Sequence, residues 1–273
     1  KWYNLAEDTP IKIKWNDETK TTIENELKKG KVKVIKVDLD NKEVKLKDVE
    51  FQVLDKDGNV LETIKTNENG EATTKDYPVR DYETLTIKET KTGKWYKLNE
   101  TPQKVTLKED EITNMTFTNE KKKGQIRVIK VDMDNNEVKL KDIEFKVYDG
   151  KGNVVETLKT DKNGEATTKR LPIDQKYTIQ ETKTLQNYVL SKKKETVTLT
   201  QDQITDITFE NEKIKGKIEI TKVSSNDNQL TKEVKGTKLE NAVFEIYTEK
   251  DKLVDTITTA KDGKATSKLL EYG

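Results

Sequence analysis

The sequence contains neither cysteine nor histidine among its 273 residues. These absences exclude disulfide bonds, zinc sites built on Cys or His, Cys/His nucleophile systems and histidine acid–base catalysis. If the protein works outside the cell, its domains must therefore be reinforced by something other than disulfides. Long apolar runs are also lacking, so we expect no membrane insertion within this sequence.

An excess of charge of one sign is lacking as well. The 52 Lys and Arg residues and 51 Asp and Glu residues give a formal net charge of +1, and the two signs are interleaved along the chain. Proteins that bind nucleic acid or anionic membranes usually carry a basic patch, which this sequence does not show. We therefore expect no nucleic-acid partner.

Hydrophobic residues make up only 31% of the sequence, against 38% for charged residues. This ratio would favour disorder if the apolar residues were scattered. They lie instead in short alternating runs, such as Met115-Thr116-Phe117-Thr118 and Ile207-Thr208-Phe209. Alternation puts apolar side chains on one face, as half-buried strands require, so an all-β protein with small cores is predicted.

A long internal repeat divides the chain. The segment Gly30-Lys-Val-Lys-Val-Ile-Lys-Val-Asp38 returns from Gly124 and, in weaker form, from Gly216, at spacings of 94 and 92 residues. A period of this length indicates one small domain per repeat. The predicted parts are the C-terminal part of a truncated repeat at 1–29 (the N-terminal segment), full repeats at 30–123 (copy 1) and 124–215 (copy 2), and the N-terminal part of another truncated repeat at 216–273 (copy 3).

Turn signals separate the alternating runs inside each full copy. Because Gly tolerates positive φ, Asp57-Gly58 and Asn69-Gly70 in copy 1 and Asn163-Gly164 in copy 2 predict hairpin turns. We predict about seven strands per copy, which favours an Ig-like or prealbumin-like β-sandwich. In copy 1 they are predicted near residues 32–38, 49–54, 60–65, 71–75, 84–89, 103–107 and 113–119.

The joints between repeats are short. Lys121-Lys122-Lys123-Gly124 and Lys213-Ile214-Lys215-Gly216 each contain one glycine and no serine or proline. Joints of this kind restrict bending, so we expect a semi-rigid rod. The sequence begins at Lys1 without Met or a signal peptide, and we expect it to be an internal part of a longer protein.

Strand alternation places polar residues in the predicted core of copy 1. Asn119 shares a face with Met115 and Phe117, and Glu89 shares a face with Ile87. Burying a carboxamide and a carboxyl without partners is costly, so both groups need something to satisfy them. Lys36 in the first strand has the right parity, although apolar residues lie on the opposite face of that strand too.

Copy 2 repeats this pattern with Lys130, Glu181 and Asn211. Burial raises the pKa of a carboxyl and lowers that of an amine, so a neutral lysine and a protonated glutamic acid can coexist. The neutral amine is a nucleophile, and the acid can polarise the carboxamide carbonyl and shuttle protons while Nζ attacks Cγ and ammonia leaves. The alternative is a non-covalent network in which the three side chains remain unreacted.

The motifs that carry these residues closely resemble a known family. They are an early Gly-x-x-x-x-x-Lys-x-Asp strand, a hydrophobic-x-Glu-Thr-Lys strand and a final Phe-x-Asn-Glu strand. This pattern resembles the Cna protein B-type repeat, also called the SpaA-like prealbumin-fold domain, of Gram-positive surface adhesins and pilins. The segment from Tyr177 to Leu190 looks like the Glu-centred box of that family, although Asn187 replaces the usual Gly and the customary Ala-Pro is missing.

The resemblance implies a self-formed isopeptide bond in each full copy, without a cofactor or metal. The implied sets are Lys36 bonded to Asn119 with Glu89 catalytic, and Lys130 bonded to Asn211 with Glu181 catalytic. Asn25 and Lys222 would belong to bonds whose partners lie outside this sequence. Each copy would react once, so we expect self-modification and no enzyme activity.

The resemblance further implies stalk repeats of an adhesin on the extracellular, cell-wall-anchored surface of a Gram-positive bacterium. The anchor, the signal peptide and a head domain that binds a host extracellular-matrix protein would lie outside this sequence. Two alternatives stay open. The chain could belong to the shaft subunit of a pilus, or the repeats themselves could bind a host matrix protein.

Two other patterns have simpler interpretations. Asp38-Leu39-Asp40 and Asp132–Asn136 faintly resemble the start of a calcium loop, but Glu137 stands where the EF-hand needs Gly, so solvated turns are expected. Trp95 and Tyr96 are expected to pack across the edge of the sandwich rather than to bind a ligand.

Overall fold

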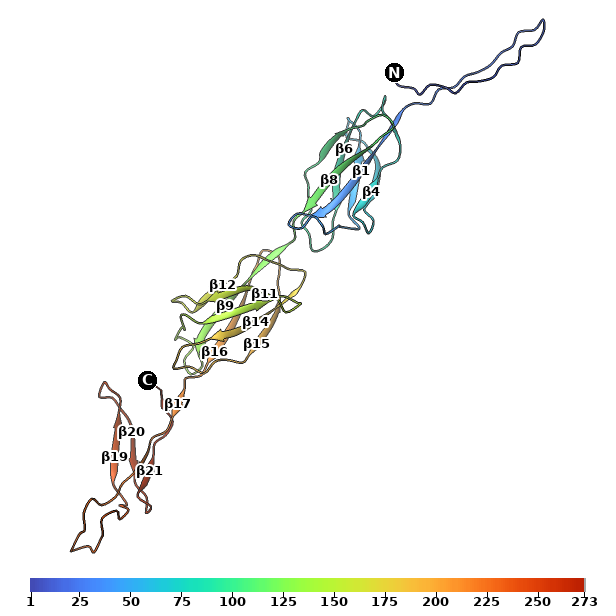
Figure 1. The fold of residues 1–273 in the computed structure, drawn as a ribbon. Coiled ribbons are helices and arrows are strands. Elements are labelled where there is room, and N and C mark those ends of the chain that lie inside the picture. The colour runs from blue at the N-terminus through green and yellow to red at the C-terminus, as the bar shows by residue number, and fades with distance from the viewer. Residues whose placement is uncertain (273) are drawn as a thin grey trace. The chain divides into compact units, whose positions relative to one another are not determined.

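The computed structural model describes residues 1–272, so Gly273, the last residue of the predicted copy 3, lies outside the described residues. The described chain contains strands and turns and no helix. It forms two compact units (Figure 1). Unit 1 comprises Lys1–Gly124 with Pro172–Asp174 and Thr200–Asp202, and unit 2 comprises the rest of the described chain.

The first sheet of copy 1 is built around its first strand. Its strands are β1 (Lys29–Asp38), β4 (Glu71–Thr73), β5 (Tyr77–Pro78) and β8 (Ile112–Asn119). Strand β1 pairs antiparallel with β4 and β5, and parallel with β8. The first and last strands of the copy are therefore neighbours, with Lys36 opposite Phe117 in the parallel register (Figure 1).

The second sheet of copy 1 is antiparallel throughout. In spatial order it contains β3 (Val60–Lys65), β2 (Glu50–Leu54), β6 (Thr84–Lys91) and β7 (Gln103–Thr106). Alternate residues of β6 are buried, and they include Glu89. In the register of β2 and β6, Glu89 is opposite Phe51.

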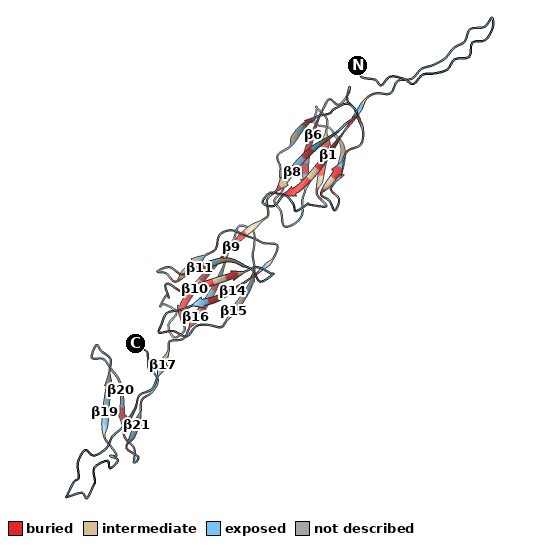
Figure 2. Cartoon of the chain, viewed as in Figure 1, coloured by how far each residue is buried: buried red, intermediate tan, exposed pale blue. Residues whose placement is uncertain are grey.

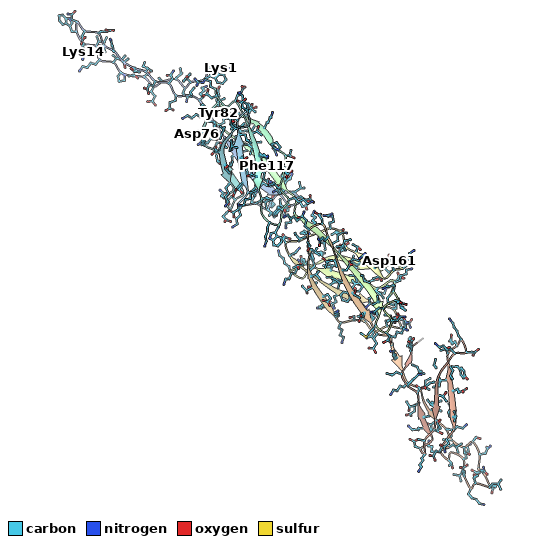
Figure 3. The ribbon with its side chains drawn as sticks, turned by 180° about the vertical axis from the view of Figure 1, so that it is seen from behind. Lys1, Lys14, Asp76, Tyr82, Phe117 and Asp161 are labelled. Atoms are coloured by element: carbon cyan, nitrogen blue, oxygen red, sulfur yellow. The ribbon has the colours of Figure 1, made fainter. Side chains whose placement is uncertain are left out.

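The core of copy 1 lies between these two sheets. Val32 and Val34 of β1 are fully buried, as are Phe51 of β2 and Phe117 of β8. The two phenylalanine rings meet across the core, with their centroids 5.0 Å apart. Figure 2 shows buried positions along these strands, and Figure 3 labels Phe117 among the strands of unit 1. This ring contact therefore joins the two sheets inside the sandwich.

Copy 2 repeats the arrangement of copy 1. One sheet has the order β12-β9-β13, with β16 parallel to β9, and the other has the order β11-β10-β14-β15. The strands are β9 (Lys123–Asp132), β10 (Glu144–Tyr148), β11 (Val154–Lys159), β12 (Glu165–Thr167), β13 (Leu171–Pro172), β14 (Lys176–Lys183), β15 (Lys194–Thr198) and β16 (Ile204–Asn211). Phe145 and Phe209 form the matching ring contact at 5.0 Å.

Within the described residues 216–272 and the joint before them, copy 3 forms three strand pairs, β17–β22, β18–β21 and β19–β20. The strands are β17 (Lys215–Gly216), β18 (Glu219–Thr221), β19 (Val243–Tyr247), β20 (Leu253–Thr258), β21 (Lys264–Thr266) and β22 (Leu270–Glu271). Several large apolar side chains in this part of the described chain are exposed, among them Val243 and Leu269. The strands that carry Glu89 and Asn119 in copy 1 have no counterpart among the described residues of copy 3.

The N-terminal segment is tied to copy 1 within unit 1. Tyr3 forms an isolated bridge with Leu27, and Trp2 packs against the hydrophobic core of copy 1. Arg80 Nη1 donates a hydrogen bond to the Tyr3 hydroxyl at 2.9 Å. The segment therefore contributes apolar and polar contacts to the repeat that follows it.

All seven strands predicted for copy 1 are present, and their ends lie within three residues of the prediction. One additional strand was not predicted. Strand β5 (Tyr77–Pro78) has only two residues, too few for alternation to be visible, and it ends in a proline. It forms because its backbone pairs with Lys29 and Gly30 of β1, a contact that local sequence does not indicate.

Gly70 brings the chain against the backbone of Lys36. Its φ is +69°, and its carbonyl oxygen accepts a hydrogen bond from the Lys36 amide nitrogen at 2.7 Å. A Cβ at Gly70 would lie 2.5 Å from the Lys36 carbonyl oxygen, and a Cβ at Gly164 would lie 2.5 Å from the Lys130 carbonyl oxygen. These turns therefore need glycine for both conformation and space.

We expect Gly70→Ala to lower the free energy of unfolding of copy 1 by about 2–4 kcal/mol, because it combines positive-φ strain with a backbone clash. The matched control is Gly58→Ala, at φ +88° with no atom within 4 Å of the added Cβ. This control should lower the free energy of unfolding only by the cost of the positive-φ conformation, about 1 kcal/mol. Urea unfolding followed by circular dichroism measures both, and equal losses would contradict the close-contact argument.

Candidate functional site

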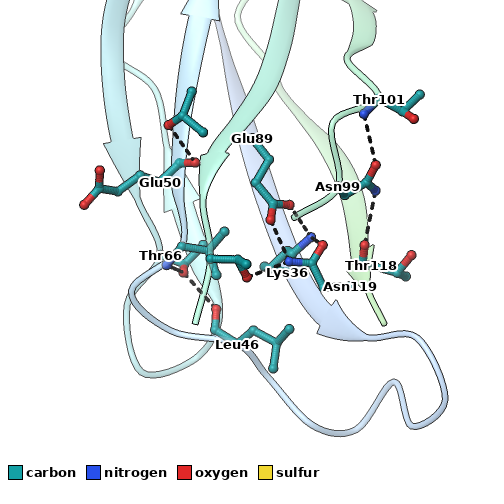
Figure 4. Close-up of polar contacts among 12 residues, drawn as sticks. Lys36, Leu46, Glu50, Thr66, Glu89, Asn99, Thr101, Thr118 and Asn119 are labelled. Carbon is teal, nitrogen blue, oxygen red and sulfur yellow. Dashed lines mark hydrogen bonds and ion pairs between the residues drawn. The ribbon is translucent and has the colours of Figure 1, made fainter. Parts of the chain in front are cut away.

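Lys36, Glu89 and Asn119 meet in the interior of copy 1. They come from β1, β6 and β8, so both sheets contribute, and at most 1% of each residue is exposed. Lys36 Nζ lies 2.6 Å from Glu89 Oε2 and 2.6 Å from Asn119 Oδ1. Asn119 Nδ2 donates to Glu89 Oε1 at 2.6 Å, which closes a ring of contacts among the three side chains (Figure 4).

Strand register explains why these side chains converge. Lys36 is opposite Phe117 in the parallel pair of β1 and β8, and paired residues point to the same side of a sheet. Asn119 follows two residues after Phe117, so it points to that side as well. Glu89 comes from the facing sheet, where its neighbour in the register is Phe51.

The surroundings of the Lys36 amine are apolar. The centroids of the Phe51 and Phe117 rings lie 5.8 and 5.9 Å from Nζ. Burial lowers the pKa of Lys36 below its usual value, and this effect outweighs the opposing hydrogen bond and charge of Glu89. This shift moves the amine toward its neutral form, which is the nucleophilic one.

The carboxyl of Glu89 faces two nitrogen atoms. One oxygen contacts Lys36 Nζ and the other contacts Asn119 Nδ2, whereas the carbonyl oxygen Oδ1 of Asn119 receives its hydrogen bond from Lys36. The sequence-based prediction had the glutamic acid polarising the carbonyl, and the geometry differs in this respect. It suits a proton transfer between the two nitrogens.

Copy 2 brings Lys130, Glu181 and Asn211 together in the same way. Lys130 Nζ donates to Asn211 Oδ1 at 2.6 Å and lies 2.9 Å from Glu181 Oε2, and Asn211 Nδ2 donates to Glu181 Oε1 at 2.6 Å. Glu181 Oε2 is paired with Lys130 by charge, and among the described residues it accepts no hydrogen bond. Burial is again the main reason that the pKa of Lys130 is lowered.

A threonine hydroxyl also contacts each carboxamide. Asn119 Nδ2 donates to Thr92 Oγ1 at 2.6 Å, and Asn211 Nδ2 donates to Thr184 Oγ1 at 2.7 Å. Both threonines follow the end of the strand that carries the glutamate, β6 or β14. The sequence analysis did not identify them, because residues beyond a strand end give no alternation signal.

The turns that follow Asp38 and Asp132 are exposed at residues 39–45 and 133–139, in line with the expected solvated turns, but the two aspartates themselves are buried. They are 2% and 1% exposed. Asp38 Oδ1 accepts hydrogen bonds from the backbone amides of Asp40 and Asn41, at 2.8 and 2.9 Å, and Oδ2 accepts one from the Tyr96 hydroxyl at 2.9 Å. The turn is present, but its own amides and a tyrosine replace water around the carboxylate.

The counterpart of this contact in copy 2 is a hydrogen bond from the Tyr188 hydroxyl to Asp132 Oδ2 at 2.7 Å. Burial by itself raises the pKa of Asp132. The hydrogen bonds from Tyr188 and from the backbone amides of Asn135 and Asp134 outweigh burial, so the pKa lies below its usual value. Asp132 therefore stays ionised beside the end of the strand that carries Lys130.

The two aromatic residues that precede the last strands of copy 1 have different surroundings. Tyr96 is partly buried and packs against the hydrophobic core, in addition to its hydrogen bond with Asp38. Trp95 is exposed, and Lys94 Nζ lies 4.2 Å from the centroid of its ring. Only Tyr96 is therefore part of the sandwich.

Asn25 and Lys222 lie in no such buried trio in the part of the chain that the structure describes. Both residues are exposed. The backbone of Lys222 nevertheless repeats the framework of the other lysines, since its amide nitrogen donates to the Gly263 carbonyl at 2.7 Å, as that of Lys36 does to Gly70. The backbone of Lys222 therefore makes the same hydrogen bond as that of Lys36, but the described residues of copy 3 include no strands that would carry the glutamate and the asparagine.

No group of three or more Asp or Glu side chains within residues 1–272 is arranged to hold a metal ion. In the same residues, no helix has the length and apolar character needed to cross a membrane.

Comparison with solved structures finds a match to the Bacillus anthracis TIE protein, with a TM-score of 0.70 and 29% sequence identity. The match covers 91% of this chain and 44% of that one, so this chain spans less than half the length of that structure. Comparison with curated protein sequences gives no match.

Two pilins are also similar over part of the chain. GBS52, the minor pilin of Streptococcus agalactiae, matches with a TM-score of 0.33 and 16% identity over 68% of this chain and 96% of that one. BcpA, the major pilin subunit of Bacillus cereus, matches with a TM-score of 0.30 and 15% identity over 68% of this chain and all of that one. Similarity at this level is too weak to support an argument about this chain.

The family comparison is more direct. The SpaA prealbumin-like fold domain matches residues 30–121, 124–213 and 216–273. These three tandem segments make up most of the chain, and two of them contain the complete sandwich and buried trio described above. The chain therefore belongs to the family of SpaA prealbumin-like fold domains.

Proposed function

We propose that this chain is a structural part of a Gram-positive bacterial surface protein, in which each complete repeat is locked by a Lys–Asn isopeptide bond that it forms itself. The observation that carries the proposal is the recurrence of one buried Lys–Glu–Asn contact in two repeats. A surface role is supported by membership of this family, because the motifs of the chain resemble repeats of Gram-positive surface adhesins and pilins.

The reaction begins with a proton transfer inside the trio. Glu89 Oε2 lies 2.6 Å from Lys36 Nζ, so the ammonium can pass a proton to the carboxylate and leave a neutral amine beside a neutral acid. Burial favours this uncharged pair, because it disfavours both charged forms. The neutral Nζ then attacks Cγ of Asn119, whose Oδ1 is already held at 2.6 Å from Nζ.

The second stage moves a proton from the attacking nitrogen to the leaving one. As the Nζ–Cγ bond forms and the Cγ–Nδ2 bond breaks, Glu89 accepts a proton from Nζ and delivers one to Nδ2. The nitrogen then leaves as neutral ammonia, and Glu89 ends as the acid that it was before the attack. The products are one amide and one ammonia, so no cofactor is required and each copy reacts once.

The competing interpretation is a trio that stays unreacted, and mass spectrometry separates the two. We expect the intact mass of the purified chain to be lower than the sequence mass by one ammonia for each complete copy. Peptide mapping should then recover branched peptides that join Lys36 to Asn119 and Lys130 to Asn211. Recovery of the full sequence mass would contradict the proposal and leave the non-covalent network.

The biological role that we propose is that of a stalk. The locked repeats would hold another part of the protein away from a cell wall, and binding to a host matrix protein would fall to a domain outside this chain. Solid-phase binding of the isolated chain to matrix proteins tests this division of roles. Saturable binding by the repeats themselves would favour the adhesive alternative.

A further inference from the structure

We infer that Thr92 and Thr184 take part in the cross-linking reaction by holding the leaving nitrogen of the asparagine. This inference rests on the proposed function. Asn119 Nδ2 donates one hydrogen bond to Glu89 Oε1 and another to Thr92 Oγ1, each at 2.6 Å. Its Oδ1 accepts from Lys36 Nζ. Both hydrogens of Nδ2 and the oxygen Oδ1 are therefore engaged.

These contacts select one orientation of the carboxamide. In the charged pair that precedes proton transfer, turning the group over would place the Nδ2 hydrogens of Asn119 against the Lys36 ammonium and Oδ1 against the Glu89 carboxylate, so donor would face donor and acceptor would face acceptor. The existing orientation keeps the carbonyl beside the nucleophile and the leaving nitrogen beside the acid. Thr92 contributes to this preference because it is the second acceptor for Nδ2, the group with two hydrogens to donate.

The contact recurs in copy 2 although the loops differ. Thr184 Oγ1 accepts from Asn211 Nδ2 at 2.7 Å. Thr92 is followed by Gly93, whereas Thr184 is followed by Leu185, so the two loops share the threonine without sharing the residue after it. Each threonine stands three residues after its glutamate, just beyond the end of β6 or β14. The hydroxyl is thus placed by the strand that also places the acid.

A hydroxyl can hydrogen-bond to the leaving nitrogen both before and after Nζ adds to Cγ. In the planar amide Nδ2 can only donate, and Thr92 Oγ1 accepts. After Nζ adds to Cγ, the same nitrogen becomes a tetrahedral amine with a lone pair, and a hydroxyl can rotate to donate to it. Thr92 is partly exposed, whereas Lys36 and Glu89 are buried, so the threonine is the most exposed of the three side chains around the carboxamide. Threonine gains and loses no proton overall.

The test compares Thr92→Val, which keeps the shape of the side chain but loses the hydroxyl, with Thr92→Ser, which keeps the hydroxyl. Each variant is purified quickly in the cold, and the Lys36–Asn119 peptide is followed over time by mass spectrometry. Copy 2 in the same molecule is the internal standard. Circular dichroism checks that both variants are folded.

We expect Thr92→Ser to be cross-linked when isolated, and Thr92→Val to be isolated partly unreacted and to convert about tenfold more slowly, the factor expected for one ordinary hydrogen bond. Thr184→Val should slow cross-linking in copy 2 and leave cross-linking in copy 1 unchanged. Complete cross-linking of Thr92→Val at the first time point, with Glu89→Gln unreacted, would overturn the inference alone. An unreacted wild-type chain would overturn the proposed function.

Discussion

Glu89→Gln is expected to leave copy 1 at its unreacted mass while copy 2 of the same molecule still loses one ammonia. Glutamine keeps the shape of the side chain but cannot carry the proton between Lys36 Nζ and Asn119 Nδ2, which contact the two carboxyl oxygens. General acid–base catalysis typically contributes about 10²–10⁴-fold to a rate. Intact mass and peptide mapping after purification measure the result.

Two further substitutions make this result specific. Glu181→Gln should reverse the pattern, with copy 1 reacted and copy 2 unreacted. Glu83→Ala removes an exposed carboxylate from copy 1 and should leave both bonds intact. Full cross-linking of copy 1 in the Glu89→Gln variant would show that the carboxyl is not the proton carrier.

Glu89→Ala is expected to be unreacted as well and, in addition, less stable than Glu89→Gln. Alanine removes the polar side chain that contacts Lys36 Nζ and leaves a cavity, whereas glutamine keeps a polar group there, and removing one partner of a buried ion pair typically costs about 3–5 kcal/mol. The comparison of the two variants by thermal unfolding separates the loss of the bond from the loss of the partner.

Pulling the chain from its two ends is expected to extend copy 1 only when the bond is absent. Force that enters at Gly30 runs along β1 to Lys36, crosses the bond to Asn119 and leaves the copy there. The loop between the bonded side chains, whose ends are 83 residues apart in the sequence, lies outside this path. Lys36→Met should therefore add an unfolding step of about 270–300 Å, the extended length of that loop.

Methionine is the substitution of choice because it fills a similar volume and has no amine to react with Asn119. Closing a loop of this length stabilises a domain by about 4–5 kcal/mol in the chain-entropy model, so Lys36→Met should also lower the unfolding free energy by roughly this amount. Single-molecule force spectroscopy measures the step, and urea unfolding measures the free energy.

The matched control is Lys33→Met on the same strand. Lys33 pairs with Glu71 at 2.8 Å and is partly exposed, so its loss removes a surface ion pair only. It should show no new step and little change in stability, because exposed ion pairs contribute about 0–1 kcal/mol. If wild-type copy 1 showed the same unfolding step as Lys36→Met, the proposed bond would be contradicted.

Strand alternation made two members of the site predictable. Side chains two residues apart share a face of a strand, so Asn119 follows Phe117 inward and Glu89 follows Ile87. The same rule was weaker for Lys36, because β1 is buried on both sides near its end, where Val37 and Asp38 are buried too. Alternation cannot separate inside from outside in such a strand.

Other parts of the site depended on contacts between distant segments. Asp38 meets the hydroxyl of Tyr96, 58 residues later in the chain, and this contact covers a carboxylate at the start of an otherwise exposed turn. Thr92 lies beyond a strand end, where no periodic pattern indicates a direction. Neither role could be predicted without knowing which strands pair.

The repeat, the all-β fold and the inward faces of the last strands could be predicted from the amino-acid sequence, because spacing and alternation are properties of the local chain. That both oxygens of Glu89 face nitrogen atoms, and that Thr92 holds the same nitrogen as the acid, became visible when the strands were seen packed together. The reason is geometric. Lys36 is 53 residues from Glu89 and 83 from Asn119, so their contacts depend on parallel pairing of β1 with β8 and on the packing of two sheets.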